Sequence, residues 1–391
     1  MREPPQPSLV RCASTVLLLF LMPVCLGEPW RLNQMQVIGT HNSYKKAMHP
    51  SIQELIRRNS GETARSLDYA HESLTRQLVD HGMRKIELDV YADPKGGHYA
   101  DPLGPRMAED LNLPRVPNHD PEGKLKQPGF KVMHVPDIDY DSNVLTFLEA
   151  LRELRRWSTG HPRHVPVLVM IELKDSAVSP EGTQPLSMER KDLMALEREI
   201  LSILPPRHLL RPDDVRGDDE SLRAAILRRG WPTLESVRGK IMFALDNTDE
   251  KRDLYLQNNP VLQGRVCFVS VEESHPAAAW FKVNDPVAHF ERIRSLVSKG
   301  FMVRTRADAG TEQARNNDPS QREKAFLSGA QFISTDYPVP NLKWSPYRVG
   351  FAKGVVARPN PVSNAAAEPG LDLESWLPAV PSIVPDASRR P

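Results

Sequence analysis

Short apolar segments recur along the chain, and most are separated by stretches with the periodicity of an amphipathic helix. Apolar segments of this length, bounded by turn residues, are typical of buried strands. We predict strands at residues 36–40, 85–90, 130–134, 165–173, 240–246, 266–271, 301–306 and 332–336. We predict helices at Leu74–His81, Asn143–Trp157, Ser187–Leu204, Asp285–Ser298 and Pro319–Leu327.

The alternation of strands and helices predicts a parallel sheet and therefore the α/β class. Eight strands favour a single-domain TIM barrel, the closed (β/α)8 arrangement, and an open doubly wound sheet is the alternative. In a barrel, functional side chains lie at the C-terminal ends of the strands. Polar residues do occupy these positions, namely His41, Asn42, Glu87, Asp89, His134, Glu172, Lys174, Asp246, Arg304 and Asp336.

Both ends of the chain differ from this pattern. Arg2 and Arg11 precede a short apolar run, and small residues follow it before Glu28, which is the pattern of a secretory signal peptide. We therefore predict a signal peptide at residues 1–27, a barrel domain at 28–344, and a secreted or periplasmic protein. Residues 345–391 are rich in Pro, Ala and Ser, so we predict a disordered tail there.

The overall composition is that of an ordinary globular protein, with 391 residues of which 40% are hydrophobic and 26% charged. Removing residues 1–27 leaves the formal charge balanced, so nothing favours binding to nucleic acid or a purely electrostatic attachment to membranes. Cys267 is then the one cysteine left, and no disulfide can form within the chain. We infer no obligate protein partner.

Carboxylates at the predicted strand ends indicate a site for a hard cation. Glu87 and Asp89 are two residues apart on a strand, so both face the same side. Glu172 and the amide oxygen of Asn42 would complete a set of oxygen ligands that suits Ca²⁺ or Mg²⁺ better than zinc. The alternative is that Glu87 and Asp89 are rim carboxylates that form ion pairs with Lys85 or Lys174.

Two histidines at the ends of different strands, His41 and His134, add acid–base chemistry to this site. Beside a hard cation, such a pair suits in-line displacement at a phosphodiester. One side chain can relay the proton of the nucleophile, and the other can protonate the leaving oxygen. The cation, together with lysine or arginine, would neutralise the phosphoryl charge.

The ordered set of motifs resembles the phosphatidylinositol-specific phospholipase C superfamily, and most closely its secreted, calcium-dependent microbial branch. The similarity extends over roughly residues 33–340. It is carried by GTHNSY around His41, IELDV around Glu87, GFKVMH up to His134, PVLVMIELKD around Glu172, MVRTRAD around Arg304 and GAQFISTDYP at the end.

The resemblance implies a distorted TIM barrel that holds one Ca²⁺ ion and binds a phospholipid substrate at a membrane surface. The metal ligands would be Asn42, Glu87, Asp89 and Glu172, the catalytic pair His41 and His134, and the substrate-binding residues Lys174, Arg304 and Arg306.

The resemblance also implies a reaction. The inositol 2-hydroxyl attacks phosphorus, diacylglycerol leaves, and an inositol phosphate or its cyclic form results. His134 would be the acid towards the leaving group. His41 would steady the phosphoryl oxygens or assist proton removal, and a calcium-bound carboxylate is the alternative base.

Three positions depart from the pattern of animal relatives, which hold ring phosphates with lysines in the middle of the barrel sequence. Here the fifth strand ends with Ala244 and Asp246, and Arg306 stands where some relatives place an aromatic residue under the inositol ring. We therefore expect phosphatidylinositol without ring phosphates to be the preferred substrate.

Two other functions fit the same scaffold. A glycerophosphodiester phosphodiesterase would cleave soluble diesters, but those enzymes usually have His-Arg-Gly where this chain has His41-Asn42-Ser43. A catalytically silent barrel used for binding is disfavoured because all the expected site residues occur together.

The predicted loop after the sixth strand contains Trp280 and Phe281. A loop at this end of a barrel lies beside the active site, and exposed aromatic side chains favour the interface of a bilayer. We therefore consider membrane docking by residues 277–281. The alternative is that both aromatic side chains pack beneath the following helix.

Overall fold

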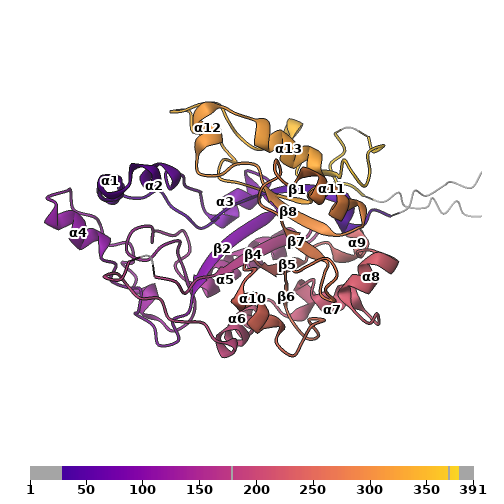
Figure 1. Ribbon diagram of the computed structural model, residues 1–391, viewed down its shortest axis with the longest axis horizontal. Helices are drawn as coiled ribbons and strands as arrows, with labels where there is room; N and C mark the ends of the chain where they lie inside the picture. Colours follow the sequence, from indigo (N-terminus) through magenta and orange to yellow (C-terminus); the bar gives the residue numbers. More distant parts are fainter. Residues whose placement is uncertain (1–28, 178, 369, 378–391) are drawn as a thin grey trace, which may run out of the picture. The chain divides into compact units, whose positions relative to one another are not determined.

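The strands of the protein are short, and most of them are parallel (Figure 1). The structure is a computed structural model that describes residues 29–177, 179–368 and 370–377. Within these ranges the strands are β1 Met35–Thr40, β2 Lys85–Tyr91, β3 Lys131–Val132, β4 Val167–Leu173, β5 Ile241–Leu245, β6 Cys267–Phe268, β7 Trp280–Lys282, β8 Met302–Arg306, β9 Phe332–Thr335 and β10 Ala357–Pro359.

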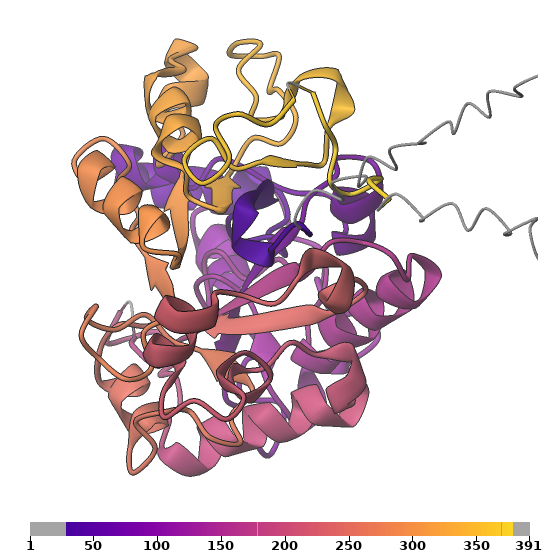
Figure 2. The same ribbon diagram turned by 90° about the vertical axis from the view of Figure 1, so that its right-hand side faces the viewer.

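Helices connect the strands and lie around the outside of them in both views (Figure 1, Figure 2). In the same ranges the α-helices are α1 Pro50–Asn59, α2 Gly61–Ser66, α3 Leu74–Val79, α4 Gly104–Asp110, α5 Phe147–Gly160, α6 Arg190–Ile203, α7 Pro212–Arg216, α8 Leu222–Arg229, α9 Leu234–Val237, α10 Glu250–Leu256, α11 Phe290–Ser298, α12 Glu312–Asn316 and α13 Ser320–Ser328. Short 3-10 helices lie at Leu32–Gln34, Lys124–Lys126, Pro206–His208 and Ala352–Gly354. Each helix described here is too short or too polar to traverse a lipid bilayer.

The strands form two five-stranded sheets, in the orders β10-β1-β9-β8-β7 and β3-β2-β4-β5-β6. Neighbouring strands are parallel except at two edges, where β10 pairs antiparallel with β1 and β3 pairs antiparallel with β2. Parallel strands joined by helices define the α/β class, which confirms the predicted fold class.

The two sheets meet where β1 passes β2. Arg84 N donates a backbone hydrogen bond to Ile38 O at 2.8 Å. Gly39 lies so close to β2 that a Cβ atom at this position would be 2.2 Å from the carbonyl oxygen of Lys85. Since that distance is far below van der Waals contact, the glycine of the GTHNSY motif is needed for the approach of the two strands.

A second junction lies between β6 and β7. The backbone N–H of Lys282 donates to Ser270 Oγ at 3.0 Å, just beyond the end of β6. The parallel strands therefore follow one another as β1-β2-β4-β5-β6-β7-β8-β9, which is the strand order of a TIM barrel. The hydrogen-bonded ladders do not close into a continuous ring, because each junction is bridged by isolated bonds.

The central strands are buried on both faces. Every residue of β2 and β5 is buried, and the same holds for all of β4 except Glu172. Helices cover the outer face of parallel strands while side chains of facing strands fill the inside, so both faces favour apolar residues. This explains why apolar runs predicted β4 and β5, whereas β2 alternates apolar residues with Lys85, Glu87 and Asp89.

The predicted strand at 130–134 is wrong as a member of the parallel set. It is reduced to the two residues of β3, which pair antiparallel with β2 through Val132 and Lys131. Its place among the parallel strands is taken by β7, which pairs parallel with β8 and which the sequence pattern did not predict.

Of the two possibilities considered for residues 277–281, the structure contradicts membrane docking. Trp280 and Phe281 belong to β7 and are 0% and 1% exposed. The ring of Phe281 packs edge to face on Phe301, with 5.2 Å between ring centroids. Side chains that are buried in the core cannot contact a bilayer, so the packing alternative is correct.

The prediction of a disordered tail from residue 345 is wrong for the part of it that the structure describes. Strand β10 pairs with β1, and Leu373 is fully buried. Glu374 forms an ion pair with Arg84 at 2.6 Å. The compact unit therefore extends from Pro29 to Leu377. The predicted signal peptide and residues 378–391 lie outside the described residues.

Candidate active site

The turn after β1 holds the first predicted catalytic residue. Ser43 N donates to Glu87 O at 3.0 Å, and Glu87 N donates back to Ser43 Oγ at 2.8 Å. Asn42 adopts a left-handed backbone conformation with φ of 44°, which asparagine tolerates better than most residues. These contacts fix His41 and Asn42 beside the carboxylates of β2.

His41 is held by a buried carboxylate from the end of β9. Its Nδ1 lies 2.8 Å from Asp336 Oδ1, and its Nε2 lies 3.6 Å from Glu87 Oε1. Arg306 lies close to both Asp336 and His41. Its NH2 is 3.3 Å from Asp336 Oδ2, and its NH1 is 3.5 Å from His41 Nε2. Burial, and then the charge of Arg306, lower the pKa of His41 well below its usual value. The neutral imidazole is therefore favoured.

His134 is also held at Nδ1 by a buried aspartate, in this case Asp139. Its Nδ1 lies 2.7 Å from Asp139 Oδ2, and Lys45 Nζ donates to the other oxygen of Asp139 at 2.6 Å. Although burial alone would raise it, His134 and Lys45 hold the pKa of Asp139 below its usual value. The ionised Asp139 thus fixes the orientation of the His134 ring.

Tyr69 connects the surroundings of the two histidines. Its hydroxyl lies 3.3 Å from His41 Nδ1 and accepts a 3.0 Å hydrogen bond from Asn42 Nδ2. Lys45, which holds Asp139 and through it His134, places its ammonium 5.2 Å from the centre of the Tyr69 ring. The structure therefore brings both predicted catalytic residues into one connected group.

Glu87 is neutralised by two cations. Its Oε2 contacts Lys85 Nζ, and Arg304 NH2 donates to the same oxygen at 2.9 Å. Arg304 also donates to Ser334 Oγ at 2.8 Å and to Asn284 Oδ1. The guanidinium predicted to bind substrate is thus engaged at Nε, NH1 and NH2, and only Oε1 of Glu87 is left for another ligand.

Asp89 has one charged partner, Lys174, and accepts no hydrogen bond from the described residues. Its side chain is fully buried. Lys174 Nζ lies 3.3 Å from Asp89 Oδ2 and 2.9 Å from Glu172 Oε1. Burial, and then the neighbouring Glu172 charge, raise the pKa of Asp89 well above its usual value. A buried carboxylate in this position calls for a cation.

The predicted metal ligands fit such a cation chemically. Asp89 and Glu172 are register partners on β2 and β4, so their side chains lie next to each other on one face. Asn42 Oδ1 is buried and, in the part of the chain described, receives no hydrogen bond. Unpartnered amide and carboxylate oxygens are the ligands that Ca²⁺ accepts. The same part of the chain contains no group of three or more His, Cys, Asp or Glu at metal-binding distances. The ligand set therefore stays a prediction.

Several residues of this group were missed by sequence reasoning. The sequence pattern assigns no role to Asp139 or Lys45, and it places Asp336 at the end of a predicted strand without a role in the site. Asp139 follows His134 by five residues within an acidic segment, and Asp336 lies in the last of the quoted motifs. The signal that could have found them is the need of each catalytic histidine for a carboxylate at Nδ1.

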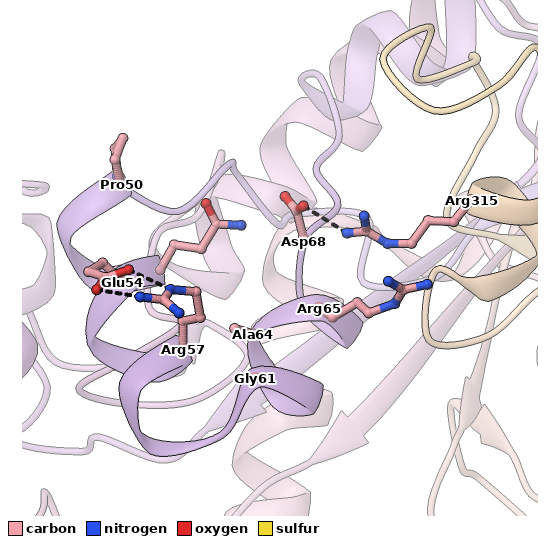
Figure 3. A pocket seen from close by; sticks show the side chains of 9 residues that line it. Pro50, Glu54, Arg57, Gly61, Ala64, Arg65, Asp68 and Arg315 are labelled. Carbon is pink, nitrogen blue, oxygen red and sulfur yellow. Dashed lines mark hydrogen bonds and ion pairs between the residues drawn. The ribbon is translucent and has the colours of Figure 1, made fainter.

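A separate cavity lies between α1, α2 and the α12 region (Figure 3). Its volume is about 340 Å³, and none of the predicted site residues lines it. Two of its arginines are paired, Arg57 with Glu54 at 2.6 Å and Arg315 with Asp68 at 2.9 Å. Since these charges are already neutralised within the protein, we assign no function to this cavity.

Two histidines, each held at Nδ1 by a buried aspartate beside a group of carboxylates, form an arrangement suited to acid–base chemistry on a parallel α/β scaffold. The chain belongs to the family of Ca²⁺-dependent phosphoinositide phospholipases C, whose family model matches residues 30–361. It is therefore a phosphodiesterase of a calcium-dependent family, as the sequence motifs predicted.

Solved structures agree on the fold. The chain is similar to a calcium-dependent phosphoinositol-specific phospholipase C from Pseudomonas sp., with 14% identity and a TM-score of 0.51 over 84% of this chain and 95% of that one. The myoinositol complex of that enzyme gives 14% identity and a TM-score of 0.51 over 85% and 96%. A Ca²⁺-dependent phosphatidylinositol-specific phospholipase C from Streptomyces antibioticus has 14% identity and a TM-score of 0.49 over 79% and 95%. No curated protein matches the chain.

Proposed function

We propose that the protein cleaves phosphatidylinositol at a membrane surface, with one bound Ca²⁺. The inositol 2-hydroxyl displaces diacylglycerol to give a cyclic inositol phosphate, which is released or opened by water to an inositol phosphate. The observation that carries this proposal is the pair of histidine–aspartate contacts, His41 with Asp336 at 2.8 Å and His134 with Asp139 at 2.7 Å. In each pair Nδ1 is occupied, so Nε2 is the nitrogen that exchanges a proton with substrate.

The two histidines have different surroundings and therefore different roles. His134 has the buried pair of Asp139 and Lys45 behind it, and it protonates the diacylglycerol oxygen as that oxygen leaves. His41 lies between Asp336 and Glu87 with Arg306 beside it. It accepts the proton of the inositol 2-hydroxyl or donates a hydrogen bond to the phosphoryl group. A carboxylate of the metal site is the alternative base.

The calcium ion would be held by Asn42, Asp89, Glu172 and the free Oε1 of Glu87. When bound, it supplies positive charge to the phosphoryl oxygens. Lys174 contacts both Asp89 and Glu172 and balances one of their two negative charges. Arg304 orients Glu87 and keeps its second oxygen occupied.

Product identification from phosphatidylinositol vesicles, with calcium and with chelator, tests this proposal. We expect diacylglycerol and an inositol phosphate only when calcium is present. Cleavage of glycerophosphoinositol in preference to the lipid would instead favour the soluble-diester activity, and binding of calcium without turnover of either would favour a silent barrel.

We also propose that the protein is exported and that residues 1–27 are removed. The support is the sequence pattern of the N-terminus. Expression with the native N-terminus should yield a mature protein that begins at Glu28 outside the cytoplasm, as determined by N-terminal sequencing. Recovery of the protein from the cytoplasm with Met1 retained would contradict export.

We expect phosphatidylinositol to be turned over faster than its 4,5-bisphosphate at equal surface concentration and calcium. Ring phosphates need free cationic donors. The end of β5 provides Ala244 and Asp246. The nearby cations Arg306 and Lys174 are already paired, Arg306 with Asp336 and Lys174 with Asp89 and Glu172. A preference for the bisphosphate in vesicle assays would show that these ion pairs open on binding.

A further inference from the structure

The side-chain amide of Asn42 has one end occupied and one end free. Its Nδ2 donates a 3.0 Å hydrogen bond to the hydroxyl of Tyr69, whereas Oδ1 is buried and receives no hydrogen bond from the described residues. Asn42 is 1% exposed, and a buried amide oxygen without a donor costs free energy unless a ligand satisfies it. The arrangement therefore leaves the oxygen end of Asn42 available to a cation.

The orientation of this amide decides what it can bind. The two ends of an amide have nearly the same shape, but one accepts hydrogen bonds and the other donates them. Only the oxygen end can bind a hard metal ion. A reversed Asn42 would expose N–H donors, which repel a cation and compete with it for the carboxylates of β2. The partner of Nδ2 therefore controls the affinity of the site for metal.

The Tyr69 hydroxyl, which is this partner, is itself held in place. Tyr69 is 9% exposed, and its backbone N–H donates to Leu67 O at 3.0 Å. Its ring stacks on His41 with 6.0 Å between ring centroids, and the ammonium of Lys45 lies 5.2 Å from the ring centre. Two residues further on, His71 Nε2 donates to His41 O at 2.8 Å. The segment that carries Tyr69 is thus attached to the turn after β1 at several points.

We propose that Tyr69 is a positioning residue of the calcium site, which accepts a hydrogen bond from Asn42 Nδ2 and thereby keeps Oδ1 as the end that binds the ion. The inference rests on the proposed function, in which Asn42 is a calcium ligand. Groups that hydrogen-bond to metal ligands fix their orientation, and their loss typically lowers metal affinity by about 10–100-fold. The same hydroxyl lies 3.3 Å from His41 Nδ1, so one side chain contacts both a metal ligand and a catalytic histidine.

The substitution Tyr69→Phe removes the hydroxyl and keeps the ring. The measurement is the affinity of the full chain for calcium alone, by isothermal titration calorimetry, so that the readout does not depend on turnover. We expect the dissociation constant for calcium to rise by about tenfold or more. The reason is that Asn42 Nδ2 loses its acceptor and turns towards the carboxylates, from which calcium must then displace it.

The substitution Asn42→Asp separates orientation of the amide from a general structural role of Tyr69. A carboxylate has two equivalent oxygens, so it needs no partner to select the end that binds the ion. In the Asn42→Asp background, the further change Tyr69→Phe should alter calcium affinity by less than about threefold, because the coupling between the two side chains is gone. An equal loss of affinity in both backgrounds would mean that Tyr69 acts on its segment as a whole, which would overturn the inference.

Tyr337→Phe is the matched control. Tyr337 is 4% exposed, and its hydroxyl has no hydrogen-bond partner among the described residues, so its removal should leave calcium affinity unchanged. If the wild type binds no calcium, the proposed ligand set fails, and this inference fails with it. If the wild type binds calcium and Tyr69→Phe binds it equally well, only the present inference fails. Calcium binding without turnover would contradict the proposed function, whereas the comparison of affinities would still decide the role of Tyr69.

Discussion

Removing calcium abolishes turnover of phosphatidylinositol, and Asp89→Asn raises the calcium concentration needed for half-maximal activity by at least about tenfold. The reason is the state of Asp89, which is fully buried and whose oxygens receive no hydrogen bond from the described residues. Its register partner is another carboxylate, Glu172. A divalent ion satisfies both charges, and an amide at position 89 supplies one neutral oxygen in place of a charged carboxylate. The measurement is initial rate against free calcium, with chelator as the zero point.

The stability of the metal-free protein provides an independent readout. Burial and the Glu172 charge oppose ionisation of Asp89, so the Asn variant removes an unfavourable charge. We expect its metal-free melting temperature to equal or exceed that of the wild type, while its stabilisation by added calcium is smaller. Asp101→Asn, at an exposed side chain outside the site, is the control and should leave both properties unchanged. Full activity in excess chelator would disprove the calcium role.

The parts of the fold that could be predicted are those with a continuous apolar signal. Strands β4 and β5 are buried on both faces, and their nearly continuous apolar sequences show it directly. Strand β7 has three residues, too few to show a period, and its aromatic side chains resembled an exposed loop. The apolar run at 130–134 was misassigned because polarity does not reveal whether a strand pairs parallel or antiparallel.

The end of the chain could not be predicted for a related reason. Strand β10 is held by backbone hydrogen bonds to β1, and the following segment by single contacts such as buried Leu373 and the Glu374–Arg84 ion pair. Isolated contacting residues that are separated by Pro and Ala produce no periodic pattern in the sequence. Composition alone therefore indicated disorder where long-range contacts provide order.

In the candidate site, too, the sequence predicts the residues themselves but not their contacts with distant parts of the chain. His41 and Asn42 directly follow β1, and Glu87 and Asp89 lie within β2, where their spacing of two residues places both on one face. Their partners do not follow from the sequence, because contacts such as His41 with Asp336 join residues that are far apart in the chain. The charge state of each group depends on these contacts, so the residues that tune the site emerge only from the fold.

Replacement of the second histidine tests the chemical step itself. His134→Ala should lower cleavage of phosphatidylinositol by about 10²–10⁴-fold, the usual contribution of a general acid or base. His134 Nδ1 is held by Asp139, which leaves Nε2 to protonate the departing diacylglycerol oxygen. The comparison substrate is an inositol phosphodiester with an aryl leaving group, which departs without a proton. Its cleavage should fall far less in the same variant.

Two further variants separate acid catalysis from positioning and from folding. Asp139→Asn removes the charge that orients the imidazole, so we expect a smaller loss with the same dependence on leaving group. His208→Ala, in the short 3-10 helix Pro206–His208 away from the site, should leave both substrates unaffected. The decisive quantity is the ratio of the losses on the two substrates. If His134 is the general acid, the loss on the lipid is much larger than the loss on the aryl substrate, because only the lipid alkoxide needs a proton to leave. If His134→Ala reduces both rates equally, His134 acts on the phosphoryl group or the nucleophile, and the acid must be sought elsewhere in the site.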